Sequence, residues 1–257
     1  MKKMSGTQII TILATLLTIT VNGLANALPL NGQGTGEISD RFAIHFVPAG
    51  YVFSIWGLIY IGLIAFSLYQ ALPAQKDNEL IKKFTPAYWI SNLANTAWIF
   101  LWHYEFFPLT LVAMITLLVT LIYIYRQLPK TDHALDNSKK WFVKYPFSIY
   151  LGWISVATIA NVSQVLFFFN WSGWGISPVI WTVIMIAIAT LLGLLMQWRE
   201  NDWLYVLVLV WAFAGIAISQ ANIALVANTA WTAGALLVLG VVLLPFLKLG
   251  TAQGISI

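Results

Sequence analysis

The sequence contains no cysteine and very little charge. None of the 257 residues is cysteine, and only 9% are Asp, Glu, Lys or Arg. The first absence excludes a disulfide framework, a thiolate nucleophile and a cysteine-based metal site. The second argues against a soluble globular domain, in which about a quarter of the residues carry charge.

Apolar residues dominate the remaining composition. They make up 60% of the chain, and the mean hydropathy is +0.82. Several apolar runs are about long enough to cross ~30 Å of hydrocarbon at 1.5 Å per residue. We therefore predict an all-α, polytopic membrane helix bundle with about eight transmembrane helices. The runs cover approximately residues 7–28, 51–72, 87–102, 109–125, 145–168, 176–198, 203–223 and 229–247.

The first run has a second interpretation. It follows Lys2 and Lys3 and ends near Ala25-Asn26-Ala27, a pattern that also occurs in cleaved signal peptides. Its length exceeds the usual 7 to 15 residue core of a signal peptide, which favours a membrane span.

The basic residues predict the orientation of the chain in the membrane. The net charge is +4, but the Lys and Arg residues lie in short loops between apolar runs, so we expect no nucleic-acid partner. If the N-terminus is cytoplasmic, all of the 13 Lys and Arg residues except Arg41 fall on the cytoplasmic side. We expect both termini to be cytoplasmic, with the lipid bilayer of a bacterial plasma membrane as the surroundings.

Ionisable residues are missing from the middle of every predicted span. Such residues form proton relays, ion paths and Schiff-base sites, so their absence argues against a proton pump or a retinal protein. The three histidines, His45, His103 and His133, lack the spacing of a metal site, and we expect them to be interfacial or solvated. An axial haem ligand at His45 is the alternative. We predict no metal site and no required cofactor.

Amide and aromatic residues follow helical spacing in three of the runs. In such a position an amide bonds to a neighbouring helix, whereas an indole offers both a flat stacking face and an N–H donor. Two interpretations stay open: the amides merely hold helices together, or the stripes line a pocket for a flat apolar ligand. The stripes consist of Phe53, Trp56 and Tyr60; of Asn92, Asn95, Trp98 and Trp102; and of Trp153, Ala157, Asn161 and Gln164.

The stretch Pro48-Ala49-Gly50-Tyr51-Val52-Phe53 resembles the Pro-Pro-Gly-Trp-Val-Phe signature of the tryptophan-rich sensory protein family, also called TspO or the peripheral benzodiazepine receptor family. Here Ala49 and Tyr51 replace Pro and Trp, and the gap from Phe53 to Trp56 is one residue shorter. Asn95-Thr96-Ala97-Trp98 is similar to a third-helix motif of the family. Residues 150–161 are similar to a fifth-helix motif, with Ile149 in place of its Pro.

This resemblance implies a five-helix bundle with a pocket roofed by the first loop, which binds porphyrins and other apolar molecules. Porphyrin or haem would then be a ligand, and a homodimer is an open expectation. Oxidative porphyrin breakdown is implied only by the likeness, and we predict no catalytic residue. The implied ligand-binding residues are Tyr51, Phe53, Trp56, Asn92, Asn95, Trp98, Trp153, Ala157 and Asn161.

The resemblance ends near residue 170, which divides the chain into two expected parts. Residues 1–170 form the TspO-like five-helix bundle, which we expect to contain the site, and residues 171–257 form an additional three-helix transmembrane block. The leading hypothesis is a membrane sensor, receptor or carrier for flat apolar ligands. The alternatives are a permease for small neutral solutes and a structural partner of another membrane protein.

Overall fold

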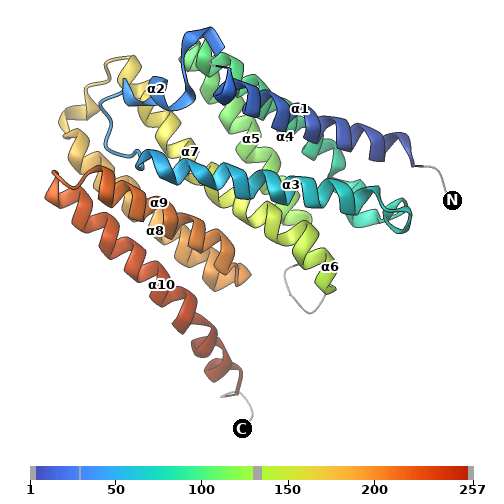
Figure 1. Cartoon of the computed structure of the whole chain (residues 1–257). Helices are drawn as coiled ribbons and strands as arrows, with labels where there is room; N and C mark the ends of the chain where they lie inside the picture. The colour runs from blue at the N-terminus through green and yellow to red at the C-terminus, as the bar shows by residue number, and fades with distance from the viewer. Residues whose placement is uncertain (1–3, 29, 130–134, 254–257) are drawn as a thin grey trace. The chain divides into compact units, whose positions relative to one another are not determined.

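The computed structural model describes residues 4–28, 30–129 and 135–253, with only the backbone described for 246–253. Lys2, Lys3 and His133, on which expectations were based, lie outside these ranges. Within them the chain forms helices joined by turns and loops, and no strand (Figure 1). The predicted all-α class is confirmed.

Ten α-helices are described, together with short 3-10 turns at Leu30–Gly32, Gly50–Ser54, Pro73–Gln75 and Gly173–Gly175 and a π-helical turn at Lys140–Lys144. The α-helices are α1 (Gly6–Ala27), α2 (Thr35–Asp40), α3 (Ile55–Ala71), α4 (Glu79–His103), α5 (Phe107–Gln127), α6 (Asn137–Lys139), α7 (Tyr145–Phe168), α8 (Pro178–Glu200), α9 (Trp203–Ser219) and α10 (Ala224–Gln253).

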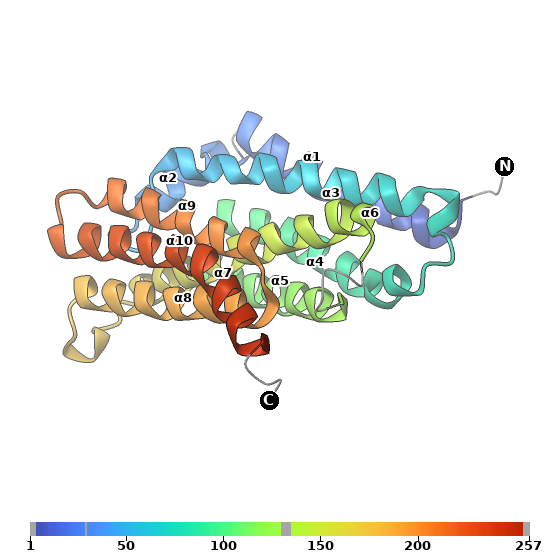
Figure 2. The same cartoon turned by 90° about the horizontal axis from the view of Figure 1, so that it is seen from below.

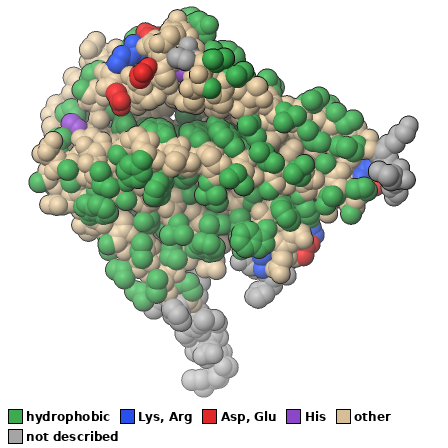
Figure 3. All heavy atoms as spheres, in the orientation of Figure 1, with side chains coloured by type: hydrophobic (Ala, Val, Ile, Leu, Met, Phe, Trp, Pro, Cys, Tyr) green, Lys and Arg blue, Asp and Glu red, His purple; other side chains and the backbone are tan. Residues whose placement is uncertain are grey.

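The helices have the length and composition of membrane spans. Six stretches in the described residues are long and apolar enough to cross a bilayer, and α9 is a shorter apolar helix. With α4, which begins in a charged segment, they account for the eight predicted helices. Figure 3 shows hydrophobic side chains over most of the visible face and few charged ones. These features confirm an integral membrane helix bundle.

Helix α4 begins earlier than the sequence predicted. We expected a connector up to Pro86, but α4 starts at Glu79 and carries Pro86 in its interior. The reason is its N-cap, because the Asn78 side chain accepts hydrogen bonds from the backbone N–H groups of Leu80 and Ile81. α4 continues through Pro86, although proline removes one backbone hydrogen bond from the helix.

Contacts divide the chain into two units, which are described separately. Unit 1 comprises Met1–Ala43 and Ser54–Asn170, and unit 2 comprises Ile44–Phe53 and Trp171–Ile257. This division by contacts falls after Asn170 and places Ile44–Phe53 with the later helices. This short segment contains the family signature.

Unit 1 is a closed ring of helices. Contacts run from α1 to α4, from α4 to α5, from α5 to α7, from α7 to α3 and from α3 back to α1. Its interior contains an aromatic core that includes Phe66, Phe84, Tyr88 and Phe147, all buried and packed mostly edge to face. A ring of five helices places the polar stripes of α4 and α7 where neighbouring helices can reach them.

Unit 2 is built on α8, α9 and α10, each in contact with the other two (Figure 2). Small residues allow close packing, since Gly193 faces Leu237 and Gly240 faces Leu194. The interior is mainly apolar, with Val206, Leu209 and Phe213 of α9 fully buried, although a few polar side chains such as Gln197 are buried as well. The segment Ile44–Phe53 completes the unit.

Candidate functional site

Asn95 connects three helices of unit 1. Its side-chain oxygen accepts a hydrogen bond from Asn22 Nδ2 of α1 at 2.7 Å, and its Nδ2 donates to the Tyr150 hydroxyl of α7 at 2.8 Å. All three side chains are buried. The amide of Asn95 is therefore engaged by the protein on both of its ends.

Asn92, one turn earlier on α4, is bonded in the same manner. Thr18 Oγ1 of α1 donates to Asn92 Oδ1 at 2.8 Å, and Asn92 Nδ2 donates to the Tyr88 carbonyl of its own helix at 2.8 Å. The Tyr88 hydroxyl in turn lies 2.7 Å from Thr15 Oγ1. These contacts make a polar seam between α1 and α4.

A second polar group joins α4, α5 and α7. Trp98 Nε1 donates to Asn161 Oδ1 at 3.2 Å, and Asn161 Nδ2 donates to Thr110 Oγ1 at 2.9 Å. The Trp98 ring stacks on Trp102, with centroids 5.1 Å apart. Trp102 Nε1 donates to the Thr35 carbonyl of α2 at 3.1 Å, so this group also holds the first loop of unit 1.

An aromatic cluster lies where α3 meets α7, and we name it the Trp56 cluster. Trp56 stacks on Tyr60 with centroids 5.6 Å apart and planes at 24°. Its ring centroid is 6.0 Å from that of Tyr150 and 6.3 Å from that of Trp153, both at steep angles. Trp153 is 1% exposed, whereas Trp56 and Tyr60 are half-buried. The side chains of Trp56 and Tyr60 thus remain partly exposed, and they lie next to the buried ring of Trp153.

The remaining predicted site residues lie elsewhere. Ala157 is half-buried on α7, one turn after Trp153. Tyr51 and Phe53 belong to unit 2, in the 3-10 turn Gly50–Ser54, and α3 begins only at Ile55. The span-like stretch Gly50–Ala71 nevertheless begins and ends within one residue of the predicted span 51–72, with a 3-10 turn ahead of α3. Tyr51 is 47% exposed and packs edge-on against Trp211 at 5.4 Å.

The histidines are held by protein groups. His103 is fully buried at the end of α4, with Nδ1 2.8 Å from the Ile99 carbonyl and Nε2 3.3 Å from Thr35 Oγ1, so the expectation of a solvated side chain was wrong. His45 is half-buried, with Nδ1 3.1 Å from Gln220 Oε1. In the part of the chain that the structure describes, no three His, Cys, Asp or Glu side chains gather as metal ligands would.

Charged groups hold the loop around α2. Arg41 forms an ion pair of 2.9 Å with Glu105, which also accepts a hydrogen bond from Gln33 Nε2 at 3.1 Å. The bond from Gln33 and then that from Arg41 lower the pKa of Glu105 below its ordinary value. Glu105 therefore stays ionised at neutral pH and keeps this loop in place.

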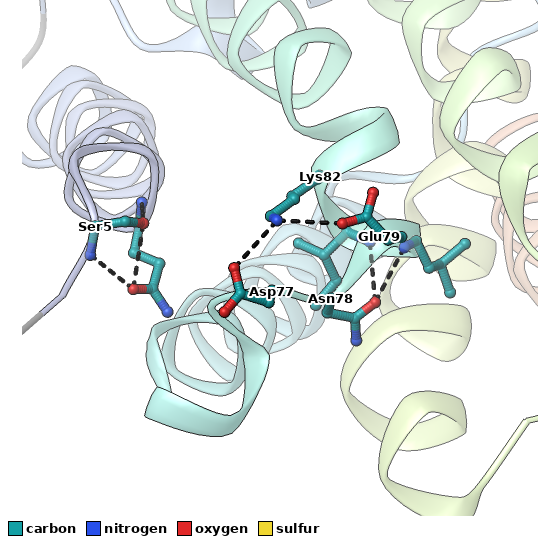
Figure 4. A network of polar contacts seen from close by, with 8 residues as sticks. Ser5, Asp77, Asn78, Glu79 and Lys82 are labelled. Atoms are coloured by element: carbon teal, nitrogen blue, oxygen red, sulfur yellow. Dashed lines mark hydrogen bonds and ion pairs between the residues drawn. The ribbon is translucent and has the colours of Figure 1, made fainter. Parts of the chain in front are cut away.

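A polar cavity of about 340 Å³ lies at the opposite end of α4. Gln8 and Gln70 line it and bond to each other's backbone carbonyls, with Gln8 Nε2 to Gln70 O at 2.8 Å and Gln70 Nε2 to Gln8 O at 3.1 Å. At its rim Lys82 Nζ lies 3.2 Å from both Asp77 and Glu79 (Figure 4). None of the predicted ligand residues lines this cavity.

Sequence reasoning missed three partners of the site. Asn22 is one of three amides in the first apolar run, with Gln8 and Asn26. Thr110 is an ordinary polar residue of α5, and Tyr150 lies in a motif but was not among the predicted ligand residues. Asn22 carried a usable signal, because an amide within an apolar span faces other helices. Thr110 carried none, since a hydroxyl can bond to its own helix.

These helices, with their interhelical amides and aromatic cluster, define an integral membrane bundle of the kind that the sequence motifs indicated. The family model of the TSPO-like proteins matches residues 8–243, and the chain belongs to this family. The match includes α8, α9 and most of α10, which we had expected to lie beyond the resemblance. No curated protein and no solved structure matches the chain.

Proposed function

We propose that this protein is a membrane sensor, receptor or carrier that binds porphyrin-like or other flat apolar molecules. The observation that supports it best is the Trp56 cluster, in which Trp56 and Tyr60 are stacked and half-buried in front of Trp153. Aromatic rings prefer offset-stacked or edge-on neighbours, so a third flat ring system extends such a stack without loss of apolar contact.

The amides have a different role in this proposal. In each of the three amides the side-chain oxygen accepts a hydrogen bond from the protein and the side-chain nitrogen donates one to it; they are Asn92, Asn95 and Asn161. This supports the interpretation that the amides hold helices together. A ligand that took their hydrogen bonds would leave buried partners unsatisfied, at a cost of about 1 to 3 kcal/mol for each group. Ligand affinity therefore comes from aromatic surface, and selectivity favours flat molecules of low polarity.

The proposal is tested by titrating the purified protein with protoporphyrin and following the absorbance of the porphyrin. Trp153→Phe retains most of the ring behind Trp56, and we expect affinity to fall about fivefold or less, equivalent to about 1 kcal/mol. Trp153→Ala leaves a cavity and removes the wall, so the loss is larger. Binding is counted per folded molecule, and unchanged affinity in a folded Trp153→Ala protein contradicts the proposal.

A permease for small neutral solutes is the second candidate. It is favoured by the apolar character of the six span-like stretches, each with at most two charged residues in its core window in the described chain. Such a composition suits passage without proton coupling. Counterflow of a neutral solute in proteoliposomes, together with no porphyrin binding, would establish this function in place of the first.

A further inference from the structure

The segment Ile44–Phe53, which carries Tyr51 and Phe53, forms hydrogen bonds with α9 within unit 2. The backbone N–H of Ala49 donates to the Gly215 carbonyl at 3.1 Å, and Trp211 Nε1 donates to the Val52 carbonyl at 3.0 Å. At the start of the segment, His45 lies 3.1 Å from Gln220. Two points of the segment thus meet α9 itself, and a third meets Gln220, the residue that caps the C-terminus of α9.

The contact with α9 depends on the missing side chain at Gly215. A Cβ atom built at this position would overlap the Val52 side chain and would lie 2.9 Å from Pro48 Cβ. Val52 is itself fully buried, and Gly215 is buried as well. A bond between two backbones requires such an approach, and only glycine permits it here without displacement of the segment.

Trp211 supports the same segment in two ways. Besides its hydrogen bond to Val52, its ring is the edge-on partner of Tyr51. The orientation of the Tyr51 side chain is thus set by a residue that lies far away in the sequence. The remaining half of the segment is anchored by Phe46, which is 1% exposed.

We propose that α9 is the positioning element for the segment Ile44–Phe53, with Gly215 and Trp211 as the positioning residues. The last helices then have a defined role, because they fix the conformation of a stretch that contains two of the predicted ligand residues. That role in binding rests on the proposed function. The attachment to α9 stands on the contacts alone.

The attachment predicts reciprocal coupling. If the ligand binds to the segment in the conformation that α9 stabilises, a substitution at Gly215 lowers the affinity for the ligand. The bound ligand in turn stabilises that conformation of the segment. Both effects are measurable on the full-length protein. Gly234 of α10 supplies a matched control, because a Cβ there meets nothing within 4 Å and the gain in helix propensity is the same.

The experiment compares Gly215→Ala with Gly234→Ala by hydrogen–deuterium exchange of the peptide that covers residues 44–53. We expect exchange in this peptide to rise about tenfold in Gly215→Ala and to stay unchanged in Gly234→Ala, because the Ala49 N–H loses its acceptor. Trp211→Phe, compared with Trp231→Phe on α10, is the second pair: it removes the bond to Val52 and leaves a smaller ring against Tyr51. Unchanged exchange in both Gly215→Ala and Trp211→Phe overturns the attachment.

Protoporphyrin titration of the same variants tests the role in binding. We expect Gly215→Ala to weaken binding about fivefold and Gly234→Ala to leave it unchanged. Altered exchange with unaltered affinity would overturn the positioning role. If the wild-type protein fails to bind protoporphyrin, the proposed function fails, and the attachment is then judged by exchange alone.

Discussion

The helices inside unit 1 and the helices inside unit 2 are stabilised by different kinds of interaction. In unit 1, buried polar side chains bond across helices, as in the chain from Asn22 through Asn95 to Tyr150. In unit 2, Thr190 and Gln197 are also buried, but Thr190 donates to the Ile186 carbonyl of its own helix and Gln197 donates to Asn201, which caps that helix. Unit 2 instead packs through apolar surface and glycine.

The comparison indicates what each unit is suited for. An interhelical hydrogen bond fixes the register of two helices, because its partners meet at one depth only, and it contributes about 0.6 to 2 kcal/mol. Unit 1 therefore has the fixed geometry that a ligand wall requires. Apolar packing around small residues is less specific about register, so unit 2 relies on additional contacts such as those to Ile44–Phe53.

The largest expected difference is in stability, when one buried amide side chain is replaced in each unit. Asn95→Leu leaves Asn22 and the Tyr150 hydroxyl without this partner, and we expect unit 1 to lose about 2 kcal/mol of stability. Gln197→Met in unit 2 removes a buried oxygen that has no hydrogen-bond partner in the described residues and one long bond, 3.3 Å, to the helix-capping Asn201, so we expect little net change.

Thermal unfolding of both variants in detergent measures this difference. Equal destabilisation by Asn95→Leu and Gln197→Met would show that the two units are not held differently.

A smaller effect comes from a pair of isosteric threonine substitutions. Thr15 Oγ1 contacts the Tyr88 hydroxyl across helices, whereas Thr190 Oγ1 donates to the Ile186 carbonyl of its own helix. We expect Thr15→Val to cost about 1 kcal/mol and Thr190→Val to cost close to nothing, since the latter hydroxyl only supplements a helix bond. Denaturant unfolding checks this, and a larger loss from Thr190→Val would refute the assignment.

The smallest effect concerns pH and the loop around α2. Because the folded-state pKa of Glu105 is lowered, its contribution is complete above the unfolded pKa and is lost as pH falls through the folded value. The melting temperature should therefore decline slightly from about pH 4.5 downward. The expected effect is small because Arg41 and Glu105 are both exposed. Glu105→Gln should abolish this part of the decline, and an identical profile in that variant would disprove the cause.

Much of the fold was predictable because apolar length is a strong signal. The bounds of α7 were predicted as Tyr145 to Phe168 and are the observed ones. The start of α4 was missed because proline was interpreted as a boundary, although the capping Asn78 lies a full two turns earlier. That residues 1–170 and 171–257 form separate domains stays a prediction.

The candidate site was predictable only in part. Helical spacing correctly placed Trp56 beside Tyr60 and Trp98 beside Trp102, because these pairs depend on one helix alone. Partners on other helices, such as Tyr150 for Asn95 and Asn161 for Trp98, depend on how helices pack, which spacing within one run does not determine. The attachment of Ala49 to Gly215 joins residues far apart in the sequence and carried no local signal.

The central claim is that the half-buried rings of Trp56 and Tyr60 provide the stacking face for a flat ligand. The most direct measurement is equilibrium dialysis of protoporphyrin against full-length protein carrying Trp56→Ala or Trp231→Ala, since Trp231 is a 52% exposed indole of α10. Loss of one stacking partner is worth about 1 kcal/mol or more, so we predict at least a fivefold loss of affinity for Trp56→Ala and none for Trp231→Ala. Equal affinity in both variants, with both proteins folded, would contradict the account.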